Sequence, residues 1–172
     1  MDIPESFLDL VIEPITQAHE VKNFNCGDQD INLYIHRFAK KNSVAGYGRT
    51  YVAVKPGHSR VWAFYTIAAA TVDASAFSST GSCPKSISVA LLGRIGRDES
   101  LRSKGIGPFL MAHVFDTAIQ SADLIGIHAV FLEAKNRDLV RYYTQLGFFN
   151  SIDNPLHMYL AIDTLKASLN DE

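Results

Sequence analysis

The stretch Arg102-Ser103-Lys104-Gly105-Ile106-Gly107 lies between a strand-like apolar run that ends near Ile95 and a helix-like run that begins near Ile106. Glycines at positions 105 and 107 let backbone N–H groups approach an anion where a Cβ atom would obstruct, and the start of a helix adds the positive end of its dipole. Arg102 and Lys104 place cationic side chains beside the same loop. The stretch therefore predicts a phosphate-binding loop, although a Gly-x-Gly after a charged pair is also typical of an ordinary turn.

The composition describes a single globular domain. The chain has 172 residues, and its hydrophobic content of 47% is enough for a sizeable buried core. Its formal net charge of −2 excludes the global basic excess of a dedicated nucleic-acid-binding protein, so any polyanion must meet a local basic patch. We therefore expect one domain over residues 1–172.

The cysteines and the apolar runs predict a cytoplasmic protein. Cys26 and Cys83 lie far apart, without CxxC spacing or a Cys/His cluster, so neither a disulfide framework nor a metal site is expected. The first ten residues lack the features of a signal peptide, and the longest apolar run, Val61–Val72, is shorter than the ~20 residues that span a bilayer. We expect free thiols and no contact with a membrane.

The order of predicted elements is β-α-ββ-β-α-β-α-β, which is typical of a mixed α/β layer protein and not of regular βαβ alternation. A loop rich in Ser, Thr and Gly is expected over residues 73–86. The predicted strands are Leu8–Ile12, Thr50–Val54, Val61–Val72, Ile87–Ile95, His128–Leu132 and Met158–Ile162. Three helices are predicted. The first begins at Asp28 and has the apolar residues Ile31, Tyr34, Ile35 and Phe38, and the second begins at Ile106 and has about four turns. The third is capped by Asn136 and ends at Gln145, shortly before Gly147.

A second motif, Asn136-x-x-Leu139-x-x-x-Tyr143-x-x-x-Gly147-Phe148, follows the glycine loop. Together with the strand, the Arg-x-x-Gly-x-Gly loop and the long helix before it, this motif resembles the two central motifs of the GNAT acetyltransferases. The resemblance covers about Ile87 to Phe148. It implies the GNAT fold, a central and mostly antiparallel mixed sheet with splayed middle strands flanked by helices, and it implies acetyl-CoA as the cofactor.

Within that superfamily the chain looks most like the acetyltransferase toxins of toxin–antitoxin pairs, which acetylate the amino group of aminoacyl-tRNA. This narrower resemblance implies a homodimer, an aminoacyl-tRNA acceptor and a small ribbon-helix-helix antitoxin as partner. It is carried by Phe24-Asn25-Cys26-Gly27 with Asp30-Ile31-Asn32-Leu33-Tyr34-Ile35, by Arg49-Thr50-Tyr51-Val52, and by Leu92-Gly93-Arg94-Ile95.

The resemblance assigns the pyrophosphate of the cofactor to N–H groups from about 103 to 107, with charge added by Arg102 and Lys104. Pro108 has no N–H, so we expect a slightly weaker cradle. From the residues alone, a β-bulge with an exposed Arg97 explains the end of the strand equally well, and helix capping suffices to explain Asn136. The predicted cofactor-binding residues are Ile95, Gly96, Arg97, Arg102, Ser103, Lys104, Gly105, Ile106, Gly107 and Asn136.

Tyr143 is the predicted catalytic residue, because it occupies the place where the family has a general acid for the departing thiolate. A lone tyrosine on a short amphipathic helix is otherwise typical of a core or rim position. Tyr142 is expected to point about 100° away from Tyr143 and to pack elsewhere. The general base stays open among Glu133, His113, His128 and His157.

Basic residues could form a rim that suits tRNA phosphates. Arg49 and Arg94 are the predicted substrate-binding residues. For the helix face that carries His36, Arg37, Lys40 and Lys41, a solvated surface is the other explanation. The leading hypothesis is a toxin that acetylates the α-amino group of aminoacyl-tRNA. The alternatives are an acetyltransferase for a small amine, an antibiotic or a protein N-terminus, and a non-catalytic CoA-binding or interaction module. The other cations of the rim are Arg97, Arg102 and Lys104, with Arg37, Lys40 and Lys41.

Overall fold

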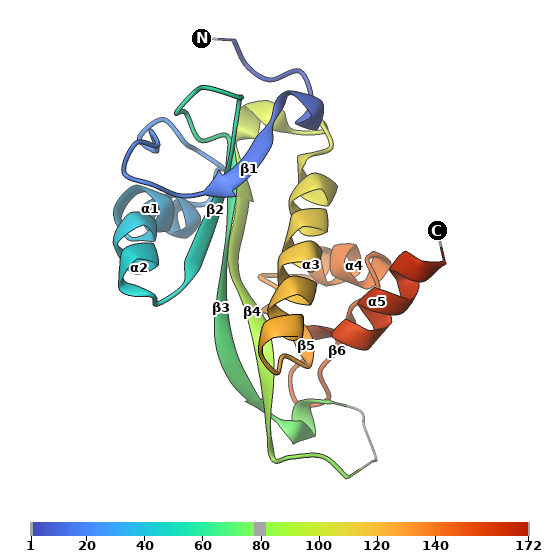
Figure 1. Cartoon of the computed structure of the whole chain (residues 1–172). Coiled ribbons are helices and arrows are strands. Elements are labelled where there is room, and N and C mark those ends of the chain that lie inside the picture. The colour runs from blue at the N-terminus through green and yellow to red at the C-terminus, as the bar shows by residue number, and fades with distance from the viewer. Residues whose placement is uncertain (1, 78–81, 172) are drawn as a thin grey trace. The chain divides into compact units, whose positions relative to one another are not determined.

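The computed structural model describes residues 2–77 and 82–171, which contain a sheet of seven strands and five α-helices. The hydrogen-bonded strand order is β1-β2-β3-β4-β5-β7-β6 (Figure 1). Strands β4 and β5 run parallel, whereas β1–β2, β2–β3, β5–β7 and β6–β7 are antiparallel. The predicted fold class, a mostly antiparallel mixed sheet flanked by helices, is therefore confirmed.

The elements follow the sequence in this order. The strands are β1 (Val11–Pro14), β2 (Arg49–Val54), β3 (Ala63–Asp73), β4 (Ser86–Arg97), β5 (Ala129–Glu133), β6 (Phe149–Asn150) and β7 (His157–Ala161). The α-helices are α1 (Gln29–Arg37), α2 (Ala39–Ala45), α3 (Ile106–Leu124), α4 (Arg137–Gln145) and α5 (Ile162–Asn170). The 3₁₀ turns are η1 (Phe7–Asp9), η2 (Ala74–Ala76) and η3 (Glu99–Leu101).

The chain divides into two compact units, Met1–Ala68 with Gly93–Val114 and Ala69–Leu92 with Phe115–Glu172. In the first unit, α1 and α2 pack against one face of β2 and β3, where Phe24, Ile35, Val52 and Phe64 form a buried apolar cluster. The alternation of strand side chains places Tyr51 on the opposite face. Helix α1 begins as expected, because the Asp28 side chain accepts hydrogen bonds from the first free N–H groups.

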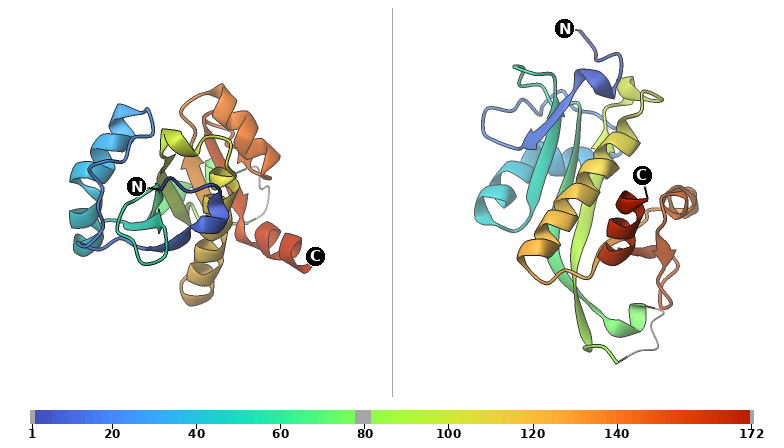
Figure 2. Two further views of the ribbon diagram at one scale, coloured as in Figure 1. Left: turned by 90° about the horizontal axis from the view of Figure 1, so that it is seen from above. Right: turned by 45° about the vertical axis from the view of Figure 1, so that its right-hand side comes forward.

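In the second unit, β5 pairs with β4 over Ala129–Leu132 and with β7 over its whole length. Phe77, Phe131 and Tyr159 are buried in the apolar cluster of this unit. Helix α4 has the predicted bounds, and Gly147 follows it with φ 102°, a conformation that favours glycine. Figure 2 shows α4 and α5 in orange and red within this unit.

Several predicted elements differ from the structure. The strand expected over Leu8–Ile12 is wrong in its first half, because Ser6 and Asp9 form a capping box that folds residues 7–9 into η1. The helix expected after Asp28 is interrupted at Phe38 and continues as α2. Helix α3 has 19 residues and exceeds the expected four turns. Helix α5 and the short strand β6 were not predicted.

No helix within residues 2–77 and 82–171 is long and apolar enough to cross a membrane. The surface loop expected over residues 73–86 contains η2, and its residues 78–81 lie outside the described part of the chain. The expectation of one domain over residues 1–172 stays a prediction.

Candidate active site

The predicted phosphate-binding loop connects η3 to α3 in the first unit, and its backbone enters the left-handed region twice. Ser103 has φ 63° and Gly105 has φ 77°, and α3 begins at the next residue, Ile106. A turn that passes through this region brings neighbouring N–H groups to one side and forms a concavity for an anion. Gly105 therefore has a conformational reason to be glycine.

The backbone donors of this loop fall into two sets. The N–H of Arg102 donates to the carbonyl of Glu99 at 3.2 Å, and that of Lys104 donates to the carbonyl of Leu101 at 3.3 Å. For the N–H groups at positions 103, 105, 106 and 107, the part of the chain that the structure describes supplies no acceptor. Such a set of donors at a helix start fits a pyrophosphate. Pro108 is the third residue of α3 and removes a donor without interrupting the helix.

The two cations of the loop have different surroundings. The Nζ atom of Lys104 donates to the carbonyl oxygen of Pro4 at 2.9 Å, so its ammonium group already has a partner within the protein. Arg102 is exposed, and no hydrogen bond or ion pair of its side chain is present among the described residues. Arg102 is therefore the cation that is available to a bound phosphate.

The end of β4 carries the residues predicted to bind the pantetheine arm. The register of β4 with β5 ends at Leu92, and β4 continues through Ile95, Gly96 and Arg97. A Cβ atom on Gly96 would lie 3.0 Å from Cγ2 of Ile31, so a larger residue here would crowd the packing of α1. Strand alternation turns the side chains of Ile95 and Arg97 to the other face.

Asp98 anchors the start of the loop, and the sequence analysis missed it. This residue is 6% exposed, and its carboxylate accepts hydrogen bonds from the N–H and hydroxyl of Ser100 and from the N–H of Asn25. The carbonyl of Asn25 accepts from the N–H of Glu99 at 2.9 Å. The Phe24–Gly27 segment thus fixes the loop to the core, and the Asp-x-Ser spacing was the available signal.

Asn136 lies in the second unit and caps α4. Its Oδ1 atom accepts a hydrogen bond from the N–H of Leu139 at 3.0 Å, as expected for an N-cap residue. The amide nitrogen of the same side chain has no partner among residues 2–77 and 82–171 and is left for a ligand. The capping role and the predicted cofactor contact are compatible.

Tyr143 is buried near the end of α4, in the second unit. Its side chain is 5% exposed, and its ring meets Phe148 edge to face at 5.6 Å between centroids. Burial, followed by the nearby phenol of Tyr142, raises the pKa of Tyr143 to about 12. The phenol is therefore protonated at neutral pH and can donate a proton. The expectation that Tyr142 packs elsewhere is wrong, because the two rings meet at 5.3 Å.

We expect Tyr143 to destabilise the fold in alkali. Because its pKa is about 12 in the folded protein and 10.0 as a free phenol, the stability that it contributes is complete below pH 10 and is lost as the pH rises to 12. This difference in pKa corresponds to about 3 kcal/mol of folding free energy. Urea unfolding at pH 9 and pH 11.5 should show a smaller loss for Tyr143→Phe than for the wild type. Equal losses would show that the pKa is not raised.

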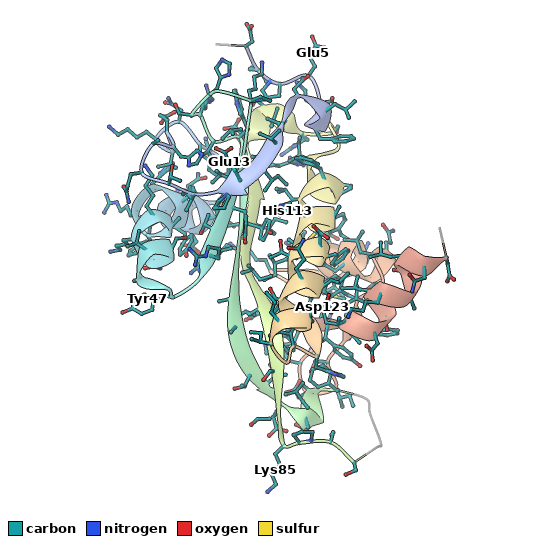
Figure 3. The ribbon with its side chains drawn as sticks, in the orientation of Figure 1. Glu5, Glu13, Tyr47, Lys85, His113 and Asp123 are labelled. Atoms are coloured by element: carbon teal, nitrogen blue, oxygen red, sulfur yellow. The ribbon has the colours of Figure 1, made fainter. Side chains whose placement is uncertain are left out.

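The candidates for a general base all have partners within their own unit. The Tyr65 hydroxyl and Nδ1 of His113 lie 2.8 Å apart in the first unit, where Figure 3 shows His113 on α3. In the second unit, Nε2 of His157 lies 3.7 Å from a carboxylate oxygen of Glu133, and the ring of His128 meets Phe77 edge to face. The general base stays open. No group of His, Cys, Asp and Glu that could hold a metal is present in the described ranges.

The predicted substrate-binding residues lie on opposite faces of the first unit's strands. The guanidinium of Arg94 stacks over the ring of Tyr34 at 4.0 Å, on the face covered by α1. Arg49 is two residues before Tyr51, so strand alternation places it on the other face. Lys41 lies over the ring of Phe38 at 4.6 Å, and the rings of Phe38 and Tyr34 stack. One cation–aromatic row is thus formed by Arg94, Tyr34, Phe38 and Lys41. Arg49 is not part of it.

Comparison with known proteins yields one family model, described as the acetyltransferase (GNAT) family, which matches residues 9–148. A tRNA-acetylating toxin of Mycobacterium tuberculosis is 29% identical over 160 residues, which are 91% of this chain and 95% of that protein. A probable toxin TacT of Sinorhizobium fredii is 30% identical over 169 residues, and the match covers 91% of this chain and 93% of that protein.

Among solved structures, a tyrosine-to-phenylalanine mutant of the toxin AtaT bound to the C-terminus of the antitoxin AtaR and acetyl-CoA superposes with a TM-score of 0.81. Its identity is 24%, and the match covers 94% of this chain and 98% of that one. At this identity the likeness establishes the fold.

Proposed function

Because the chain belongs to the acetyltransferase (GNAT) family, and is thus an acetyl-CoA-dependent N-acetyltransferase, we propose that its acceptor is the α-amino group of aminoacyl-tRNA. The observation that carries the proposal is the similarity to a tRNA-acetylating toxin over 91% of the chain. The set of N–H groups at positions 103, 105, 106 and 107, which have no acceptor among the described residues, supports binding of the cofactor. A toxin that acts in this way blocks translation, since an acetylated amino group cannot attack a peptidyl ester.

Acetyl-CoA, when bound, supplies an acetyl group activated as a thioester. We assign its pyrophosphate to the free N–H groups of the loop and to Arg102, and its pantetheine arm to the backbone of residues 95–97. The amide nitrogen of Asn136 is assigned to the same cofactor. Tyr143 holds a proton on its hydroxyl at neutral pH, which suits it to protonate a leaving sulfur.

The chemistry of the acceptor supports an aminoacyl ester over a lysine side chain. An α-amino group has a pKa near 7.7–8.0, whereas a lysine has one near 10.4, so about a tenth of the former but less than about a thousandth of the latter is free base at neutral pH. Such an acceptor needs little help from a general base, and none stands out in either unit. The similarity to a tRNA-acetylating toxin over 91% of the chain supports the same acceptor.

We propose that the cation–aromatic row contacts tRNA phosphates. Arg94→Ala and Lys41→Ala should each weaken tRNA binding roughly three- to tenfold at low salt and reduce the salt slope by about 1. Lys85→Ala is the matched control, because this exposed cation projects into solvent ahead of β4 (Figure 3). Filter binding at several salt concentrations measures both quantities. Equal slopes for Arg94→Ala and Lys85→Ala would remove Arg94 from the interface.

The proposed acceptor is tested by expression of the protein in bacteria. We expect growth arrest, with acetylated aminoacyl-tRNA detected by mass spectrometry of extracts, and we expect Tyr143→Phe to abolish both. Acetylation of free amines without tRNA would instead support a small-molecule or protein N-terminal acceptor. Binding of CoA without release of thiol would support a non-catalytic module.

The assembly implied by the resemblance is part of the same proposal. We propose a cytoplasmic homodimer whose partner is a small antitoxin of the ribbon-helix-helix type. Light scattering with size exclusion measures the oligomeric state, and co-expression with the product of an adjoining short reading frame should relieve the growth arrest. A monomer, or an arrest that no such product relieves, would contradict this part.

A further inference from the structure

The segment Pro4–Asp9 is bound to the phosphate-binding loop by two hydrogen bonds that run in opposite directions. The Nζ atom of Lys104 donates to the carbonyl of Pro4 at 2.9 Å, and the N–H of Phe7 donates to the carbonyl of Lys104 at 3.3 Å. Both bonds involve Lys104, which lies between the two left-handed residues of the loop. The segment therefore contacts the loop next to Ser103, a non-glycine residue with φ 63°.

The ring of Phe7 packs on the same loop. A Cβ atom on Gly105 would lie 2.9 Å from Cδ1 of Phe7, so the ring lies directly against the glycine backbone. The ring also contacts Phe109 on the first turns of α3, with centroids 5.5 Å apart. Phe7 thus bridges the loop and the helix whose start carries the free N–H groups.

The segment is itself ordered by local hydrogen bonds. The Asp9 carboxylate accepts from the N–H groups of Glu5 and Ser6, and the hydroxyl of Ser6 accepts from the N–H of Leu8. Its other side borders an open cavity of about 710 Å³ toward the β2–β3 connection, where Leu8 is 80% exposed. Phe7 and Leu8 are therefore neighbours in one turn, of which only Phe7 packs on the loop.

We propose that Pro4–Asp9 is a positioning element of the cofactor site. It holds the loop in the conformation that presents the N–H groups at positions 103, 105, 106 and 107, and Phe7 is its central residue. Lys104 acts in this arrangement as a tether between segment and loop, and not as a direct ligand of phosphate. The inference rests on the proposed function, in which this loop binds the pyrophosphate of acetyl-CoA.

The test compares Phe7→Ala with Leu8→Ala, two truncations within one turn. Calorimetry with CoA and steady-state release of thiol from acetyl-CoA give the Kd, the KM and the kcat. For Phe7→Ala we expect the Kd and the KM to rise about tenfold while kcat stays within about twofold. Leu8→Ala should match the wild type. Phe7→Leu, which keeps an apolar contact, should fall between the two and replaces Phe7→Ala if that variant does not fold.

A double-mutant cycle separates a tether from a phosphate ligand at Lys104. If Lys104 acts through the segment, Phe7→Ala and Lys104→Ala together should weaken CoA binding little more than the stronger single change. Lys104→Ala should also leave the salt dependence of CoA binding unchanged. Additive losses, or a reduced salt dependence, would identify Lys104 as a direct ligand and overturn its role as a tether.

The outcomes distinguish this inference from the proposed function. A wild-type protein that binds no CoA would contradict the proposed function itself. A wild type that binds CoA, together with a folded Phe7→Ala that binds it equally well, would overturn the inference alone. Equal losses in Phe7→Ala and Leu8→Ala would also overturn it, because the effect would then not depend on packing against the loop.

Discussion

Tyr143→Phe is expected to lower kcat for acetyl transfer by about 10²- to 10⁴-fold while the affinity for acetyl-CoA stays unchanged. The substitution removes the hydroxyl and keeps the ring that packs against Phe148. Because the pKa of Tyr143 is about 12, the wild-type phenol is protonated throughout the physiological range, and the variant lacks this proton donor at every such pH. Release of free thiol and calorimetry with CoA measure the two quantities.

Tyr142→Phe is the matched control, since it makes the same chemical change one residue earlier. Its ring contact with Tyr143 is kept, and removal of its phenol lowers the pKa of Tyr143 without bringing it near neutrality. We expect this variant to retain kcat within about threefold. A kcat of Tyr143→Phe equal to that of the wild type would exclude Tyr143 as the proton donor.

Gly105→Ala is expected to raise the KM for acetyl-CoA at least about tenfold. The residue has φ 77°, a conformation that costs an L-residue about 1–2 kcal/mol, and each 1.4 kcal/mol is a factor of ten in affinity. The added Cβ would also meet the ring of Phe7 at 2.9 Å, so the loop and the segment that holds it are displaced together. The N–H groups of the cradle then lose their alignment.

Gly46→Ala controls for backbone strain alone. Gly46 has φ 79° and ends α2, but no heavy atom lies within 4 Å of the position of its Cβ. Both variants should therefore unfold more easily in urea, whereas only Gly105→Ala should affect the KM. If the two glycine variants bind acetyl-CoA equally well, the conformation of the loop does not determine affinity for the cofactor.

Local patterns in the sequence predicted much of this structure. Asn136 as a helix cap, α4 with Gly147 after it, and the glycine loop before α3 depend on residues a few positions apart, and these features are confirmed. The wrong strand over Leu8–Ile12 also has a local explanation. The capping box of Ser6 and Asp9 is visible in the sequence, but the apolar run beside it favoured a strand.

Contacts between distant residues could not be predicted in this way. The hydrogen bond from Lys104 to Pro4 joins residues 100 positions apart, so no spacing rule indicates it. The contact of Tyr142 with Tyr143 was missed for another reason. The Cα–Cβ bonds of neighbouring residues on a helix point in different directions, but large side chains can rotate toward each other. Here the ring centroids lie 5.3 Å apart. The placement of Arg49 and Arg94 on opposite faces could not be predicted without knowing how the strands pair.

The packing of Gly96 limits how this protein can be redesigned. Ile31 of α1 occupies the space that a side chain at position 96 would fill, and Asn25 just before α1 is bonded to Asp98 at the end of the same strand. A helix transplanted from another acetyltransferase to change the acceptor would therefore place a different residue at position 31, directly against Gly96 of the strand assigned to the cofactor. Directed evolution of acceptor choice should succeed first on the outer side of α1, where Leu33 and Arg37 are exposed, and Ile31 should remain fixed.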